Sequence, residues 1–315
     1  MNRFLYLIAF VVPFMILVHV SAKSHNQGSL FPDPPLKYSS YNHTEYTLSP
    51  WRGRNVAVLT KSKQLDHTTM ERLLAGIDSA YDYYYNMTGK KPENHFTYKG
   101  RLLIAEVSSS TCNGAACGWP GSTGIELVND TFKILYTRVK ANYTFDQVVF
   151  YELGRNFWYY QPQLGKVHPF STGFAILNRF LSMEAAGLKG APFKPDMPFD
   201  EFKRSILKDL LDIYLADDTL SWRNTLAINM APSNPNGWGD ADLAAAMLNV
   251  INVDAGPNGL RTFWRTLRTL PAAKTDVEAM GNFLCAGKTA TGHDYRDLLR
   301  DNSLPMPSRE ACMSK

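Results

Sequence analysis

The sequence predicts an α+β fold, in which a lobe with a mixed sheet and helices is followed by an all-helical lobe. Runs typical of strands occur no later than residue 136, and helical spacing dominates from residue 174 onward. A single amphipathic run, FDQVVFYELGRNFW (145–158), lies between the two parts. Because strands followed by helices favour segregated layers over alternating βαβ units, we assign an α+β lobe to 51–160 and a helical lobe to 161–315.

The N-terminus has the pattern of a secretory signal peptide at 1–22. Arg3 precedes an apolar stretch at 4–18, and Val20-Ser21-Ala22 has the small residues of a signal-peptidase site. Pro13 interrupts the stretch, which is shorter than the roughly 20 residues of a membrane span. A retained anchor is the alternative. We expect a secreted, extracellular protein without a membrane span after cleavage.

The α+β lobe is expected to begin near Trp51, after an extended lead-in at 23–50. An amphipathic helix is predicted at 68–88, and Gly89 follows it as a C-cap. A hairpin break is expected at Asn129-Asp130, between the last two strands. The predicted strands are 55–59, 101–107, 124–128 and 132–136.

The second lobe reads as a series of helices without strand patterns. Apolar residues recur at helical spacing in each of six segments. The predicted helices are 174–186, 199–215, 241–253, 260–270, 276–286 and 293–301.

Four cysteines follow the signal peptide, an even count that favours two disulfides in a secreted chain. Sequence proximity favours Cys112–Cys117 with Cys285–Cys312 over the other two pairings. The short loop is not a metal knuckle, because no second pair of Cys or His lies near it.

N-glycosylation is predicted wherever the acceptor asparagines are exposed, which would make the chain a glycoprotein. All four sequons precede residue 145. They begin at Asn42, Asn86, Asn129 and Asn142.

The composition describes a globular protein with a substantial core, since 45% of its residues are hydrophobic and 12% are aromatic. The net charge is only +4, and no run of Lys or Arg is present. We therefore expect no nucleic-acid partner.

The run between the lobes has the shape of a zinc-protease active-site helix that has lost its histidines. In H-E-x-x-H, two His at i and i+4 bind Zn²⁺ on one helix face and the Glu is the general base. Here Tyr151 and Arg155 occupy the ligand positions, and Glu152 keeps the base position. A guanidinium stays protonated and cannot ligate a metal. Thr144 to Gln147 fits a capping box that would start this helix.

The order of elements and this motif resemble the gluzincin-type secreted zinc metallopeptidases, as a degenerate, catalytically inactive member. The resemblance implies a zincin-like first lobe, with Tyr151 and Arg155 at vestigial metal positions. It implies Glu184 as the third metal position and 124–127 as the edge strand that lines the substrate cleft. It spans roughly residues 55–307.

Loss of both histidines leaves one carboxylate in the ligand set, whereas catalytic zinc needs three protein ligands. We expect no metal, no cofactor and no peptidase activity. Arg155 is predicted to lie within about 4 Å of Glu184 or Glu152, and Tyr151 to bond a carboxylate or water in the same cleft.

The expected role is that of a pseudoenzyme, which binds an extracellular protein or glycan or belongs to an extracellular matrix. The alternatives are a structural component of a skeletal matrix and an active secreted hydrolase with an atypical site. A metal site rebuilt from scattered residues would draw on His168, which otherwise caps a helix or lies on the surface.

Overall fold

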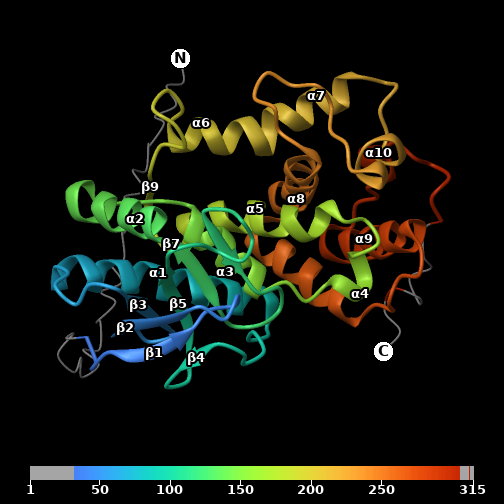
Figure 1. Cartoon of the computed structure of the whole chain (residues 1–315). Helices are drawn as coiled ribbons and strands as arrows, with labels where there is room; N and C mark the ends of the chain where they lie inside the picture. The colour runs from blue at the N-terminus through green and yellow to red at the C-terminus, as the bar shows by residue number, and fades with distance from the viewer. Residues whose placement is uncertain (1–31, 306–311, 313–315) are drawn as a thin grey trace, which may run out of the picture. The chain divides into compact units, whose positions relative to one another are not determined.

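The computed structural model describes residues 32–305 and Cys312. It confirms the α+β class, because a seven-stranded mixed sheet occupies the N-terminal half and helices form the C-terminal part (Figure 1). The predicted signal peptide at 1–22 and the start of the lead-in, 23–31, lie outside the described residues.

The sheet has the strand order β1-β2-β3-β5-β7-β6, and β4 pairs beside β5. Strands β3, β5 and β7 are parallel, while β2 and β6 run antiparallel to their neighbours. The strands are β1 (Leu36–Ser39), β2 (Glu45–Arg52), β3 (Val56–Thr60), β4 (Thr97–Tyr98), β5 (Arg101–Val107), β6 (Ala116–Gly118) and β7 (Ile125–Val128).

Two sequence expectations about the sheet are wrong. The segment at 23–50 includes all of β1 and most of β2, so folded structure begins before Trp51. Residues 125–127 of the predicted edge strand belong to β7, which lies inside the sheet, and the edge strand on that side is β6. Strand β6 is only Ala-Cys-Gly, a composition with low strand propensity, and it is held by pairing with β7.

The two faces of the sheet are packed against different parts of the chain. On one face, Leu59 and Val107 belong to a core that includes Tyr38 and Leu48 of the β1–β2 hairpin. This burial explains why the lead-in folds. On the other face, helices α1, α2 and α3 contact the strands. Their bounds are α1 (His67–Thr88), α2 (Asn129–Asn142) and α3 (Val148–Asn156).

Helix α1 agrees with its prediction, and helix α2 does not. The Asp66 side chain accepts a bond from the Thr69 amide at the start of α1, and Gly89 ends it with φ 68°. The predicted strand at 132–136 is part of α2. Phe132, Leu135 and Val139 are its buried residues, a helical spacing that a five-residue window of β-prone side chains concealed.

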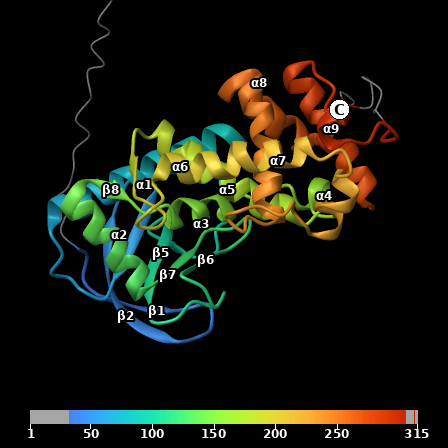
Figure 2. The ribbon, with the colours of Figure 1, turned by 90° about the horizontal axis from the view of Figure 1, so that it is seen from above.

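The C-terminal part is built around α5, which contacts α3, α1 and α8. The segment predicted as one helix at 199–215 forms α6, a π-helical turn η1 and α7, which Figure 2 shows as one continuous rod. The helices predicted at 241–253 and 260–270 form one element, α8, kinked at Gly256 (φ 64°) before Pro257.

The predicted 293–301 helix is reduced to the four residues of α10. Short 3-10 turns, η2 and η3, lie between α7 and α8. The elements are α4 (Gln161–Leu164), α5 (Pro169–Ala185), α6 (Phe199–Arg204), η1 (Ser205–Asp209), α7 (Leu210–Ala216), η2 (Trp222–Asn224), η3 (Leu226–Ile228), α8 (Asp240–Thr269), α9 (Asp276–Thr291) and α10 (Arg296–Leu299).

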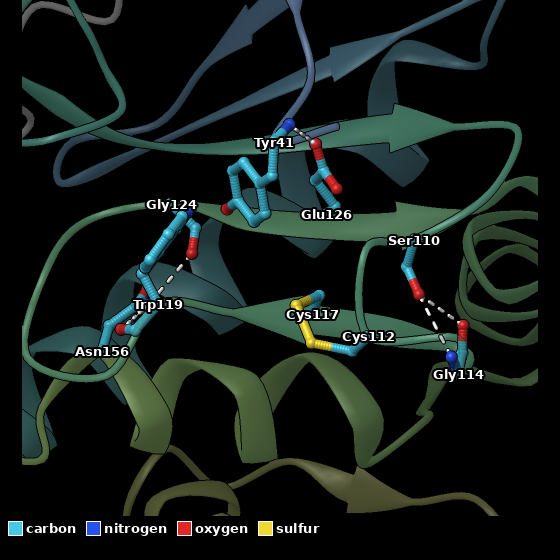
Figure 3. Close-up of a disulfide and its surroundings, with 9 residues drawn as sticks. All are labelled: Tyr41, Ser110, Cys112, Gly114, Cys117, Trp119, Gly124, Glu126 and Asn156. Atoms are coloured by element: carbon cyan, nitrogen blue, oxygen red, sulfur yellow. Dashed lines mark hydrogen bonds between the residues drawn. A yellow bond between two sulfur atoms is a disulfide. The ribbon is translucent and has the colours of Figure 1, made fainter. Parts of the chain in front are cut away.

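The cysteines pair as their spacing favoured. Cys112 joins Cys117, which ties the loop after β5 to the edge strand β6 (Figure 3). Cys285 of α9 joins Cys312. Neither disulfide crosses between the sheet and the helical part.

Across residues 32–305, no helix is both long enough and apolar enough to cross a bilayer.

Candidate functional site

Helix α3 carries the degenerate motif, but it does not begin with the predicted capping box. Thr144 and Phe145 form strand β8, which pairs with β9 (Lys189–Gly190). The helix therefore starts at Val148, whose amide donates to the Asp146 carboxylate at 3.1 Å. Pairing with a strand about 45 residues away in sequence overrode the local signal.

The Glu152 side chain extends from α3 toward Gly118 of the edge strand β6. Only 7% of it is exposed. Burial raises its pKa to about 7, opposed by the positive charge of Arg155 and by the Gly118 amide. A Cβ on Gly118 would lie 2.7 Å from the Glu152 carbonyl oxygen and 2.9 Å from its Oε2. Glycine at position 118 is what lets the strand approach this carboxylate.

The other end of α3 is fixed to the β6–β7 hairpin by hydrogen bonds. Asn156, fully buried, donates from Nδ2 to the carbonyl oxygens of Trp119 (2.9 Å) and Gly124 (3.0 Å), as Figure 3 shows. The Gly121 amide donates to the Arg155 carbonyl at 3.1 Å. Sequence reasoning missed Asn156 and Gly118, although Asn156 directly follows the motif.

Tyr151 and Arg155 both project toward the start of α5, where they meet hydroxyl groups. Arg155 donates from Nη1 to Ser171 Oγ at 3.4 Å. The Tyr151 hydroxyl lies beside the Thr172 side chain; burial raises its pKa, and Arg155 opposes that rise. The predicted partner of Tyr151 is a carboxylate or water, and the protein group that it contacts is the threonine at 172.

Glu184 is not part of this site, so its assignment as the third metal position is wrong. It is exposed and forms an ion pair with Lys203. It lies 12 residues beyond Thr172, about 18 Å farther along α5. Arg155 forms no ion pair with Glu184 or Glu152 among the described residues, which also overturns the predicted pairing. Alignment by residue count placed the glutamate on the wrong part of the helix.

Arg179 occupies the space on the α5 side of Tyr151 and was missed by sequence reasoning. It is 8% exposed, and its guanidinium carbon lies 5.9 Å from the Tyr151 ring centroid. It also packs over Phe180 and Phe202, at 4.6 and 4.8 Å from their centroids. Burial lowers its pKa to about 10. The available signal was an arginine inside the apolar run FAILNRFLSM.

These residues do not fit the zinc ion that the resemblance implies. Arginine cannot ligate, and α5 supplies the hydroxyls of Ser171 and Thr172 where a carboxylate ligand would be needed. In the described part of the chain, no cluster of three or more His, Cys, Asp or Glu could hold a metal ion. His168 lies exposed just before α5.

No family model matches the chain, and a search of curated proteins gives no match. Two solved structures have a similar fold. They are a functionally unknown conserved protein from Bacillus anthracis str. Ames (TM-score 0.53) and a conserved protein mutant from the same organism (TM-score 0.54). Each is 10% identical and aligns over 84% of this chain and 51% of its own, so this chain spans about half their length. At this identity the likeness shows the fold alone.

Proposed function

We propose that this chain is a secreted pseudoenzyme, a metallopeptidase-like protein without peptidase activity that binds an extracellular polypeptide. The observation that carries the proposal is Arg155 at the second ligand position, bonded to Ser171. A permanent positive charge at that position repels a cation, and its five N–H donors favour an acceptor instead.

The elements around the former site are kept in a form suited to binding. Strand β6 lies at the edge of the sheet, and only β7 pairs with it among the described strands. Val128 donates to the Ala115 carbonyl and Trp119 donates to the Gly124 carbonyl, so the backbone groups of Ala116 point away from β7. An extended peptide adds to a sheet edge by main-chain hydrogen bonds. All three residues of β6 are buried, and the Gly118 amide already donates to Glu152, so such addition is confined to the backbone groups of Ala116. A structural role in an extracellular or skeletal matrix is compatible with the same edge.

One observation favours the alternative, an active hydrolase with an atypical site. A carboxylic acid with a pKa of about 7 suits a general acid or base at neutral pH, and Glu152 has that value. It would need a nucleophile, and the hydroxyls of Ser171 and Thr172 are candidates because they contact Arg155 and Tyr151 of the motif.

Zinc analysis of purified protein, with a digest of a peptide library, separates the two. We expect well under one zinc per chain and no cleavage. Stoichiometric zinc, or cleavage that Glu152→Gln abolishes, would overturn the pseudoenzyme and support the hydrolase. The double variant Tyr151→His with Arg155→His should bind more zinc than wild type, yet weakly, because α5 offers no third ligand.

Secretion and matrix association need a separate test. Expression of the full chain in a secretory host should release a product whose N-terminus follows Ala22. Recovery from soluble medium supports a binding role, whereas recovery only after extraction of an insoluble matrix supports the structural one.

A further inference from the structure

Two guanidinium groups flank Tyr151, and neither has an acidic partner. Arg155 is one turn farther along α3 and donates to Ser171. Arg179 approaches from α5 and donates from Nη1 to the Gln147 side-chain oxygen at 2.8 Å. Its Nε is buried without a hydrogen-bond partner. Among the described residues, neither arginine forms an ion pair.

The acids closest to Arg179 are committed elsewhere. Asp242 accepts the Gly239 amide at 2.9 Å, at the start of α8. Asp146 forms an ion pair with Arg138 at 2.5 Å. Both acids act on Arg179 only through longer-range attraction. Arg179 is thus a buried cation without a directly paired anion, which is unfavourable, and negative charge brought to the half-buried Arg155 beside it would offset that cost.

We propose that the half-buried surface where Tyr151 and Arg155 of α3 meet Ser171 of α5 binds a carboxylate group. Arg155 would hold it through its planar fork, the hydroxyls of Tyr151 and Ser171 would donate to it, and Arg179 would stabilise its charge from behind Tyr151. Ser171 and Thr172 lie in the first turn of α5, where aligned peptide dipoles also favour an anion. This inference rests on the proposed binding function and names its ligand chemistry.

Two sources can supply the carboxylate, namely the C-terminus of a polypeptide and an Asp or Glu side chain. Both present the same planar oxygens to Arg155. A peptide with a free C-terminus and no acidic side chain tests the first source, and a C-terminally amidated peptide with one internal Asp tests the second.

The experiment is an NMR titration of the arginine Nε–H signals in metal-free wild-type protein. N-acetylglycine carries the carboxylate, and N-acetylglycinamide is its neutral match. The acid should shift the signals of Arg155 and Arg179, and the amide should not. Arg155→Met should weaken binding about 10-fold or more, because a charge-assisted hydrogen bond is lost. The affinity of Arg155→Lys for N-acetylglycine should lie between those of wild type and Arg155→Met, since lysine keeps the charge but lacks the planar pair of donors.

Arg72→Met is the matched control. Arg72 packs over the Tyr143 ring at 4.0 Å and forms no ion pair among the described residues, so the same net charge is removed elsewhere. Its affinity for N-acetylglycine should equal that of wild type. Equal binding of acid and amide, or equal losses in Arg155→Met and Arg72→Met, would overturn the carboxylate site. Such a result leaves the zinc and cleavage assays unchanged, so it is distinguishable from failure of the proposed function.

Discussion

The sheet and the α3–α5 interface treat buried charge in opposite ways. On the sheet side, Asp78 accepts the amides of Arg54 (2.6 Å), Asn55 (2.7 Å) and Val56 (3.1 Å). Arg54 and Asn55 lie in the turn that leads into β3, and Val56 is the first residue of that strand. The charge is satisfied within the fold, and it holds α1 to the sheet.

Glu126 on β7 is satisfied within the fold at one of its two oxygens, while its Oε2 is buried without a hydrogen-bond partner. It is fully buried, and its Oε1 accepts the Tyr38 hydroxyl at 3.0 Å and the Tyr41 amide at 2.8 Å. Figure 3 shows Tyr41 beside this carboxylate, next to the Cys112–Cys117 disulfide. These bonds fasten the segment after β1 to the centre of the sheet.

At the α3–α5 interface, Arg155 and Arg179 lie around Tyr151, and neither forms an ion pair with any described residue. Glu152, which faces β6, forms none among these residues either. Their hydrogen-bond partners are neutral. Asp78 therefore has a full set of partners, whereas Arg179 keeps its buried Nε unused. This difference is the reason for placing the proposed ligand site at the α3–α5 interface.

Asp78→Ala should have the largest effect, because it leaves three inward-facing amides without their charged acceptor. The free energy of unfolding should fall by about 3–5 kcal/mol in urea titrations followed by circular dichroism. Asp82 lies one turn farther along α1, and its side chain is 43% exposed. Asp82→Ala should therefore lower the free energy of unfolding by about 1 kcal/mol or less. An equal loss of unfolding free energy in Asp78→Ala and Asp82→Ala would show that the three amide bonds to Asp78 do not stabilise the sheet in this way.

Glu152→Gln should change the pH dependence of stability. Since burial raises the pKa of Glu152 from 4.5 to about 7, the folded protein keeps a proton that the unfolded chain has released between these values. Wild-type stability should therefore fall as pH rises from about 4.5 through about 7, by roughly 3 kcal/mol at most. The variant should lack this decline when unfolding is measured at pH 5 and pH 8. Glu71→Gln, on the exposed side of α1, should retain the wild-type profile.

Gly118→Ala should cost about 1–3 kcal/mol, because the new methyl group would push α3 away from β6. The measurement is the melting temperature, and Gly114→Ala is the control variant. The nearest atom to a Cβ at Gly114 is 3.8 Å away, so that methyl group has room. If the two variants melt alike, the close approach of strand and carboxylate is not required for stability.

Glu126→Gln should have the smallest effect, within about 1 kcal/mol, because the amide oxygen can still accept from Tyr38 and Tyr41. The comparison is with Glu152→Gln at the same pH in urea titrations. Burial raises the pKa of Glu126 as well, and its hydrogen bonds from Tyr38 and Tyr41 oppose that rise, so its variant should lose less of the pH dependence than Glu152→Gln does. An equal loss of pH dependence in the two variants would show that the carboxylates do not differ in this way.

Local patterns predicted those elements in which the buried residues recur at one regular spacing, either that of a helix or that of a strand. Helix α1 and its Gly89 cap, strand β5 and the proximity pairing of the cysteines all follow from spacing along the chain. Helix α2 was misread because β-prone side chains in a short window outweighed its helical repeat. Strand β6 left no local signal, since its pairing with β7 forms it.

The sequence by itself determined the α+β class and the absence of histidine from positions 151 and 155, because periodicity and residue type are local properties. Only the tertiary structure decided which residues of α5 meet the motif. Arg179 lies beside Tyr151 and Glu184 lies far from it because α3 and α5 pack at one relative position, set by side-chain contacts such as those of Arg155 with Ser171 and Gln147 with Arg179. That position depends on packing between segments distant in sequence, which a count of residues cannot supply.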